Sequence, residues 1–287
     1  MLRADGATAY LYGEVTGYWL VWAARRAPCP RRLAAAVDFI EGQWTGGRPG
    51  TTRLGAVADW RNGALFSFDL AMMLRGLGAA ARVLGPRRCR PAADAIRPWL
   101  DRLVAADGTL AACLPLSGAT LPVRWSTQPG PFQAKTAAAI LAAPGAWRSP
   151  RITLAAQATL ERWRGRAAEH RAAHPRLYAV EGACLAAGGS PPLALLTARG
   201  EDDDDAPRAD ALAQRLRLLC LCPEAPAAVL EEAALELLPH VAEDGGLRFR
   251  VEDQAANVWA ALFAEQAFRW FDRRKATGRL PDVRELV

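Results

Sequence analysis

The sequence has few of the residues from which β-sheets, metal centres and membrane helices are built. Only 8% of its residues are aromatic, and it contains three His residues. Val, Ile, Thr and Tyr, which favour strands, are scarce beside Ala and Leu, the best helix formers. With 287 residues, of which 51% are hydrophobic, the chain is long enough to bury a large core. The composition therefore predicts an all-α protein with at most a short hairpin.

Long apolar runs are also missing. No uncharged apolar stretch reaches the roughly 18 residues that a membrane-spanning helix needs. Asp5 and Glu14 interrupt the N-terminal stretch, which therefore lacks the basic region and clean apolar run of a signal peptide. We expect a cytoplasmic protein without a membrane partner.

Recognisable metal, redox and nucleotide motifs are absent. The six cysteines are irregularly spaced, and Cys220 and Cys222 form Cys-x-Cys rather than the Cys-x-x-Cys of zinc and redox sites. His170 and His174 lie one turn apart without a nearby Glu or Cys in a metal motif. No phosphate loop, Gly-x-Ser-x-Gly or dinucleotide fingerprint occurs. The sequence predicts buried reduced thiols, no bound metal and no cofactor.

The charge balance is mildly basic, with a net charge of +6 and a pI near 9.3. The arginines are scattered over the outer faces of the expected helices, and no basic stripe alternates with aromatic residues. This distribution argues against a nucleic-acid partner. It suits a small molecule or oligosaccharide substrate that is anionic.

Apolar residues recur at helical spacing over most of the chain. Gly- and Pro-rich breaks separate these segments, and no long interdomain linker occurs, so we predict a single domain over 1–287. The expected helices are 8–26, 31–43, 66–84, 91–106, 131–142, 150–170, 175–187, 190–199, 207–221, 225–242 and 253–273.

These segments alternate in character. Those starting near 8, 66, 131, 175, 207 and 253 carry polar clusters and small residues, while those between them are amphipathic with charged faces. Six inner helices with about five outer ones are the plan of an (α/α)6 toroid. Because 190–199 is short and 274–287 has no strong helix, the ring is either incomplete or closed by a non-helical tail. An irregular α-solenoid is the alternative, and 108–130 is expected to form a hairpin over one mouth.

Each of the six inner segments begins with polar side chains where a buried helix normally has Leu or Ala. An unpaired buried polar group costs about 1–3 kcal/mol, so these positions need partners. We infer that the six helix starts converge on one pocket. The clusters are Tyr12/Glu14/Tyr18, Phe68/Asp69, Gln133/Lys135, Tyr178/Glu181, Arg208/Asp210/Gln214 and Asn257/Trp259.

These residue types indicate proton transfer and anion binding. Tyr18 lies one turn after Glu14, and burial raises a Glu pKa toward neutrality. Lys135 is one of only two lysines and stands at a helix start, where a cation opposes the macrodipole. Glu14 as a cap, Lys135 in solvent and Asp210 as a helix-start acid are the structural alternatives. The catalytic candidates are Tyr12, Glu14, Tyr18, Tyr178 and Glu181, and the substrate-binding candidates are Asp69, Trp125, Lys135, Arg208, Asp210, Gln214, Asn257 and Trp259.

Several short phrases resemble bacterial toroid proteins of exopolysaccharide biosynthesis, described as prenyltransferase-like or squalene-oxidase-repeat-like. The resemblance spans nearly the whole chain and implies an α/α toroid in a carbohydrate context. At the level of fold, that class is similar to uronyl C5-epimerases, polysaccharide lyases and N-acylglucosamine 2-epimerases. The connections here are shorter than in the family. The phrases are Tyr12–Tyr18, Phe68-Asp69 with Leu74–Leu77, Lys135-Thr136, Tyr178-x-x-Glu181-Gly182, Arg208-x-Asp210-x-x-x-Gln214 and Asn257-x-Trp259 with Phe263 and Gln266-Ala267.

The leading hypothesis is a carbohydrate-active enzyme that acts on an acidic saccharide by general acid–base chemistry, as an epimerase or lyase. Lys135 and Arg208 would hold the substrate carboxylate. A glycoside hydrolase, which needs two carboxylates, and a non-catalytic glycan- or peptide-binding scaffold are alternatives. A terpenoid-type cyclase is a further one, although the inner helices offer few Phe and Tyr and the acidic run 201–205 is expected to be a solvated loop.

Overall fold

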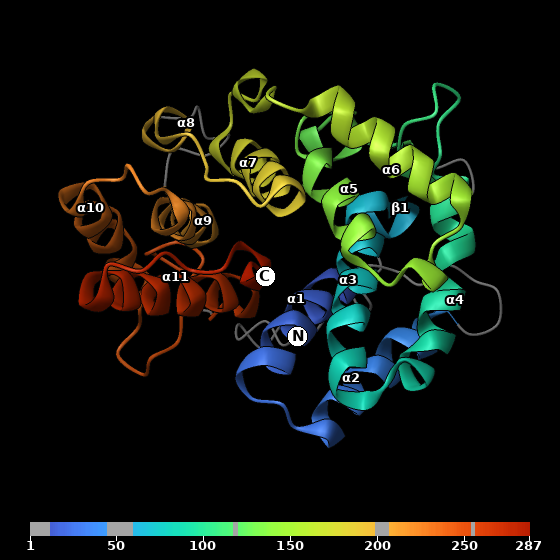
Figure 1. The fold of residues 1–287 in the computed structure, drawn as a ribbon, viewed down its shortest axis with the longest axis horizontal. Helices are drawn as coiled ribbons and strands as arrows, with labels where there is room; N and C mark the ends of the chain where they lie inside the picture. Colours follow the sequence, from blue (N-terminus) through green and yellow to red (C-terminus); the bar gives the residue numbers. More distant parts are fainter. Residues whose placement is uncertain (1–11, 45–59, 117–119, 199–206, 254–255) are drawn as a thin grey trace.

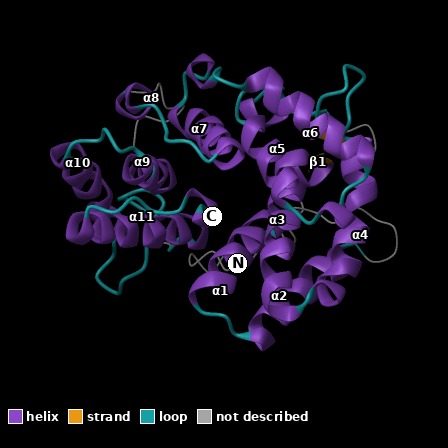
Figure 2. Ribbon diagram, in the orientation of Figure 1, coloured by secondary structure: helices purple, strands orange, loops and turns teal. Residues whose placement is uncertain are grey.

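The computed structural model describes residues 12–44, 60–116, 120–198, 207–253 and 256–287. It consists mostly of helices, so the all-α prediction is confirmed (Figure 2). Residues 8–11 of the first expected helix, most of the Gly-rich loop (45–59) and the acidic run 201–205 lie outside the described residues. No described helix is long and apolar enough to cross a membrane.

The helices alternate between inner and outer positions along the chain (Figure 1). The inner helices are α1 (Gly13–Arg26), α3 (Ser67–Leu84), α5 (Gln133–Ala142), α7 (Ala173–Ala187), α9 (Ala209–Leu221) and α11 (Val258–Thr277). The others are α2 (Pro30–Gln43), α4 (Pro86–Arg102), α6 (Pro150–Trp163), the short α8 (Leu193–Thr197) and α10 (Ala227–Leu237).

Each inner helix packs against the next, and α11 also contacts α1. Helices α2, α4, α6 and α10 pack on the outer side of this series (Figure 1). The division into inner and outer helices agrees with how deeply their residues are buried. The first 15 residues of the inner helix α3 are all buried, whereas the outer helix α4 buries only one stripe of its surface. The core is therefore built mainly from the inner helices and the apolar faces turned toward them.

Glycine and proline explain where the helix bounds differ from the predicted ones. Helix α4 starts before the predicted residue 91 because Gly85 has a φ of 83° and Pro86 suits the first helical position. Helix α6 ends at Trp163 rather than at 170, since Gly165, with a φ of 71°, turns the chain. The predicted 190–199 helix forms only over the five residues of α8.

One two-stranded antiparallel sheet occurs in the described residues (Figure 2). Strand β1 (Ala64–Phe66) pairs with β2 (Cys113–Pro115), with Leu65 opposite Leu114. The expected hairpin within 108–130 is therefore replaced by a pairing with the segment that precedes α3. All three residues of β1 are buried, which makes this segment a good partner for an apolar strand.

Two pairs of inner helices approach so closely that only glycine fits between them. A Cβ on Gly76 of α3 would collide with the backbone of Gly17 on α1. A Cβ on Gly182 of α7 would collide with the backbone of Lys135 on α5. This second approach brings the side chain of Glu181, the residue before Gly182, next to Lys135.

After α11 the chain turns back toward the inner helices. The turn is made at Gly278, whose φ of 67° is left-handed. A short 3-10 helix, η6 (Val283–Glu285), follows, and Leu286 and Val287 are both fully buried. Figure 1 places this end of the chain between α1, α7 and α11.

The six cysteines form no disulfide. Cys89, Cys184, Cys220 and Cys222 are buried, and burial raises the pKa of Cys184 to about 12. Cys29 differs, since it is exposed just before α2, contrary to the expectation of buried thiols.

Candidate functional site

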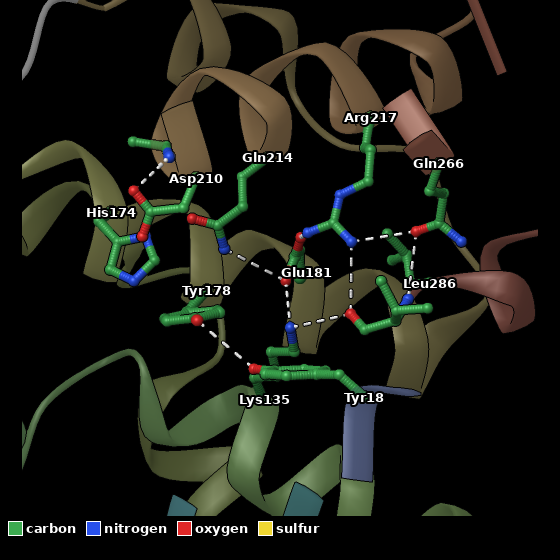
Figure 3. A network of polar contacts seen from close by, with 12 residues as sticks. Tyr18, Lys135, His174, Tyr178, Glu181, Asp210, Gln214, Arg217, Gln266 and Leu286 are labelled. Atoms are coloured by element: carbon green, nitrogen blue, oxygen red, sulfur yellow. Dashed lines mark hydrogen bonds and ion pairs between the residues drawn. The ribbon is translucent and has the colours of Figure 1, made fainter. Parts of the chain in front are cut away.

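Polar side chains from the inner helices meet at the centre of the molecule (Figure 3). Lys135 of α5, Glu181 of α7 and Gln214 of α9 are fully buried and connected by hydrogen bonds. Glu14 of α1 is also buried, and the charge of Lys135 acts on it. The structure therefore brings residues from four of the predicted clusters into one place.

A central ion-pair network consists of Lys135, Glu181, Gln214, Arg217 and Gln266. Lys135 Nζ lies 2.5 Å from Glu181 Oε2, and Arg217 Nη2 lies 2.5 Å from Oε1 of the same carboxylate. Gln214 Nε2 donates to Oε2 at 3.4 Å, while Arg217 Nη1 donates to Gln266 Oε1 at 3.0 Å. Both oxygens of Glu181 are thus bonded, without any contact with solvent.

The pKa shifts of this network follow from burial and mutual charge. Burial alone would raise the pKa of Glu181, but the charges of Arg217 and Lys135 outweigh it and hold the pKa below its usual value. Burial lowers the pKa of Lys135 to about 8, although Glu181 opposes the change. The carboxylate is therefore firmly ionised, and the ammonium is the group that gives up its proton first as the pH rises.

Aromatic rings surround the ammonium of Lys135. Its Nζ lies 4.5 Å from the ring centre of Tyr178, 4.9 Å from that of Tyr18 and 5.4 Å from that of Phe263. The Tyr18 hydroxyl donates to the Tyr178 hydroxyl at 3.4 Å. Burial raises the pKa of both phenols well above 10, so they keep their protons at every physiological pH.

Glu14 lies beside this network, against Asp69 of α3. Burial raises the pKa of Glu14 above its ordinary value. Hydrogen bonding with Tyr12 and the charge of Lys135 oppose that increase, and so do weaker hydrogen bonds with Tyr18 and Asp69. The environment thus moves this carboxyl toward the range in which it can exchange protons at neutral pH.

An aromatic corner, formed by Trp125, His174, Tyr178, Asp210 and Trp259, lies beside the network. The His174 ring is centred 4.4 Å from Tyr178, 5.5 Å from Trp259 and 5.9 Å from Trp125. His174 Nδ1 lies 3.5 Å from Asp210 Oδ2, and neither ring nitrogen has a partner at full hydrogen-bond geometry among the described residues. Burial lowers the pKa of His174 to about 4, while Asp210 and, more weakly, Gln214 act in the opposite direction.

Asp210 is held as a carboxylate by Arg208. The guanidinium makes a two-pronged contact, with Nη2 at 2.6 Å from Oδ2 and Nε at 3.1 Å from Oδ1. Burial would raise the pKa of Asp210, but the charges of His174 and Arg208 lower it. Because His174 is neutral above about pH 4, Arg208 is the cation that keeps Asp210 ionised at neutral pH.

Lys135 and Arg208, expected to hold a substrate carboxylate, are each paired with a carboxylate of the protein.

Asn257 is the N-cap of α11, because its Oδ1 accepts from the Ala260 amide at 2.9 Å. Its position is explained by helix capping without a ligand. The other predicted site residues are buried, and five are partly exposed: Tyr12, Trp125, Arg208, Asn257 and Trp259.

The aromatic content of the centre is greater than the sequence suggests. The sequence predicts too few Phe and Tyr to line a cavity, but the structure joins rings from distant segments into one cluster. The members are Tyr18, Phe68, Trp125, Phe132, Tyr178, Phe249, Trp259 and Phe263. The sequence does not reveal this cluster, because its loop and helix-end aromatic residues are far apart along the chain.

A cavity of about 660 Å³ lies behind the aromatic corner, between α7, α8, α9 and α10. Leu177, Val229 and His240 are among its lining residues, and so is Arg208, but His174 is not. Arg208, with its partner Asp210, therefore separates this cavity from the imidazole.

Four central residues are absent from the sequence-based candidates: Arg75, His174, Arg217 and Gln266. Arg75, Arg217 and Gln266 lie deeper in their helices than the opening turns, whereas His174 is the second residue of α7. Arg217 is seven residues after Asp210, and Gln266 is seven after Trp259, so both continue the same helix face. Extending each polar cluster by two turns along its face would have found these two.

Among the described residues, no group of three or more His, Cys, Asp or Glu is placed to hold a metal ion. No family model matches the chain, and no curated protein or solved structure is detectably similar to it.

Proposed function

We propose that this chain is a carbohydrate-active enzyme that acts on an acidic saccharide by general acid–base chemistry of the epimerase or lyase type. We also propose that its helices form an α/α toroid and that it is related to the toroid proteins of exopolysaccharide biosynthesis. The observation that carries it is the His174 imidazole, buried, without a close hydrogen-bond partner and placed between Asp210 and three aromatic rings. A buried unpartnered polar group is costly, and such costs concentrate at functional sites.

His174 has the properties of a general base. Its low pKa leaves the imidazole neutral at physiological pH, so it can accept a proton. The ionised Asp210, whose Oδ2 lies 3.5 Å from Nδ1, stabilises the imidazolium that this transfer produces. An anionic substrate would raise the pKa of His174 from this lowered value and so strengthen the base.

Tyr178 lies one turn after His174 on α7 and supplies a protonated phenol. Because both groups project from one helix face, they would meet the same side of a sugar ring. This arrangement favours β-elimination over epimerisation, which exchanges protons on opposite sides. His174 takes the proton alpha to the carboxylate, a carbon–carbon double bond forms, the carbon–oxygen bond beta to the carboxylate breaks, and Tyr178 protonates the leaving oxygen.

The partly exposed rings of Trp125 and Trp259 supply apolar surfaces for a sugar ring. A glycoside hydrolase is less well supported, because it needs two carboxyl groups about 5–10 Å apart with free oxygens. Glu181 and Asp210 are bound in ion pairs, and Glu14 is in hydrogen-bonding contact with Asp69.

The test is an elimination assay on a panel of uronic-acid oligosaccharides, which follows the ultraviolet absorbance of the new double bond. His174→Gln keeps polarity while removing the base, so kcat should fall about 10²–10⁴-fold. Tyr178→Phe should also reduce kcat, and Trp259→Ala should mainly raise KM. The acid limb of kcat/KM should lie near pH 4, the pKa of His174. A fully active His174→Gln enzyme would exclude this mechanism.

A terpenoid-type tailoring cyclase is the second candidate, favoured by the ring cluster around the Lys135 ammonium. Aromatic faces that hold an ammonium also stabilise carbocations. Conversion of an isoprenoid diphosphate, with no activity on uronates, would support this candidate instead.

A further inference from the structure

Helices α7 and α9 pack against each other and carry two matching rows of polar side chains (Figure 3). Both rows have the spacing i, i+4, i+7 of one helix face, and each member of the second row follows its counterpart by the same number of residues. The rows are His174, Tyr178 and Glu181 on α7, and Asp210, Gln214 and Arg217 on α9.

The two ends of these rows are paired across the helix interface. His174 Nδ1 lies 3.5 Å from Asp210 Oδ2 at one end. At the other end, Arg217 is bonded to Glu181. Gln214 therefore stands in the middle, between the proposed base and the central ion-pair network.

The side-chain amide of Gln214 is oriented by Glu181. Its Nε2 donates to Glu181 Oε2 at 3.4 Å, while its Oε1 has no partner at full hydrogen-bond geometry among the described residues. The charges of Arg217 and Lys135 keep Glu181 ionised in spite of its burial. An ionised carboxylate only accepts hydrogen bonds, so it faces the nitrogen of an amide and not its oxygen. The oxygen of Gln214 is therefore the end directed toward His174 (Figure 3).

Two acceptors thus act on the His174 ring from α9. Asp210 is ionised and faces Nδ1, so it has no proton to donate there. Burial lowers the pKa of His174, and hydrogen bonding with Gln214 is one of the effects that oppose this change. The two ring nitrogens point in different directions, so Nδ1 carries the hydrogen toward these acceptors while Nε2 keeps its lone pair. A reversed Gln214 amide would present a donor and favour the opposite tautomer.

We propose that Gln214 is a positioning residue, which transmits the orientation imposed by Glu181 to His174 and fixes the imidazole as the Nδ1–H tautomer. Nε2 is then the basic atom. The catalytic meaning of this tautomer rests on the proposed function, in which His174 removes a proton from the substrate. Gln214 is fully buried, so it acts through the ring and not on a substrate.

The test measures the tautomer directly, by long-range proton–nitrogen NMR correlation of the imidazole rings at pH 7, where His174 is neutral. The chain contains three histidines, so few signals need assignment. The wild-type protein should show Nδ1–H as the main species of His174. Gln214→Met keeps the length of the side chain and removes both amide contacts. The ratio of the Nε2–H to the Nδ1–H tautomer should then rise about two- to tenfold, the effect of losing one hydrogen bond.

Leu216→Met is the matched control. Leu216 is equally buried on α9, but it lies two residues beyond Gln214, where a side chain faces away from this row. This variant should leave the tautomer ratio unchanged. An unchanged ratio in Gln214→Met, or the same change in both variants, would overturn the inference. If Gln214→Met does not fold, the wild-type spectrum decides: Nδ1–H as the main species supports the inference, and Nε2–H overturns it.

Kinetics separate a failure of this inference from a failure of the proposed function. In the elimination assay, Gln214→Met should lower kcat about tenfold or more with KM unchanged, because the imidazolium loses one acceptor. A changed tautomer with an unchanged kcat would retain the coupling and exclude His174 as the base. An unchanged tautomer with a lowered kcat would overturn the coupling and leave the base to be decided by His174→Gln.

Discussion

The central ion-pair network and the aromatic corner lie side by side, yet their central titratable groups, Glu181 and His174, are bonded very differently. In the network, both oxygens of Glu181 are bonded, by Lys135 and Arg217 among others. In the corner, His174 is also buried but has no hydrogen-bond partner at full geometry, and two of the three rings around it, Trp125 and Trp259, are partly exposed.

The difference separates groups that fix the structure from groups available for chemistry. A buried carboxylate with both oxygens bonded, as in Glu181, is costly to disturb, although Arg217 Nε and Gln214 Oε1 beside it have no hydrogen-bond partner among the described residues. An unsaturated group keeps its capacity to bind a proton or a ligand. Lys135 and Glu181, which the sequence names as candidates, are bonded to each other, whereas His174, which is not among those candidates, has no partner of this kind.

The largest effect should come from breaking the network at Glu181. Glu181→Gln keeps the shape but leaves the buried charges of Lys135 and Arg217 without their anion. The free energy of unfolding should fall by about 3–5 kcal/mol, as for other broken buried pairs. Urea denaturation checks this, and an unchanged midpoint would show that the network is not what fixes the centre.

The aromatic corner should dominate the pH dependence of stability on the acid side. The folded-state pKa of His174, about 4, lies below the ordinary value of 6.5, so the unfolded chain binds more protons between these values. Stability should therefore fall as the pH drops from 6.5 to 4, by on the order of 3 kcal/mol from this group. His174→Phe should flatten that part of the profile in urea unfolding measured at pH 4, 5, 6 and 7. An unchanged slope would place the titration elsewhere.

Gly182→Ala tests whether the network depends on the close approach of α5 and α7. The added Cβ meets the backbone of Lys135, so the helices must separate. We expect a loss of about 1–3 kcal/mol in unfolding free energy, as for other overpacked positions. Gly42→Ala is the matched control, since a Cβ at Gly42 meets nothing within 4 Å. Equal effects of the two substitutions would show that the approach is not tight.

The smallest effect concerns Asn257, which belongs to neither region although it begins the helix that carries Trp259. Asn257→Ala should cost about 1 kcal/mol of stability by removal of the α11 N-cap, and Asn257→Asp should restore it. Thermal melts measure both variants. A ligand-binding role would instead appear as a raised KM in both variants, with an unchanged Tm.

The fold class could be predicted because Ala, Leu and helical spacing determine it locally. The shared location of Glu14, Lys135 and Glu181 could also be predicted, since each opens an apolar helix and needs a partner. Arg217 and Gln266 were predictable in principle, because they continue the same faces deeper into α9 and α11.

The partners themselves could not be predicted. The sequence does not show that Lys135 pairs with Glu181, or that Trp125 in a loop lies against His174, because these contacts join distant segments. The position of Leu286 and Val287 depends on the path of an irregular segment with no periodic signal. Which buried groups pair with one another is a property of the tertiary structure alone.

The exposure of Cys29 has a consequence for reagents that react with thiols. Alkylation requires an accessible thiolate, and burial raises the pKa of the other five cysteines. A maleimide should therefore react first at Cys29, at the start of α2 on the outer side of the helices. Cys29 is thus the preferred attachment point for a dye or spin label, ahead of the partly exposed Cys113.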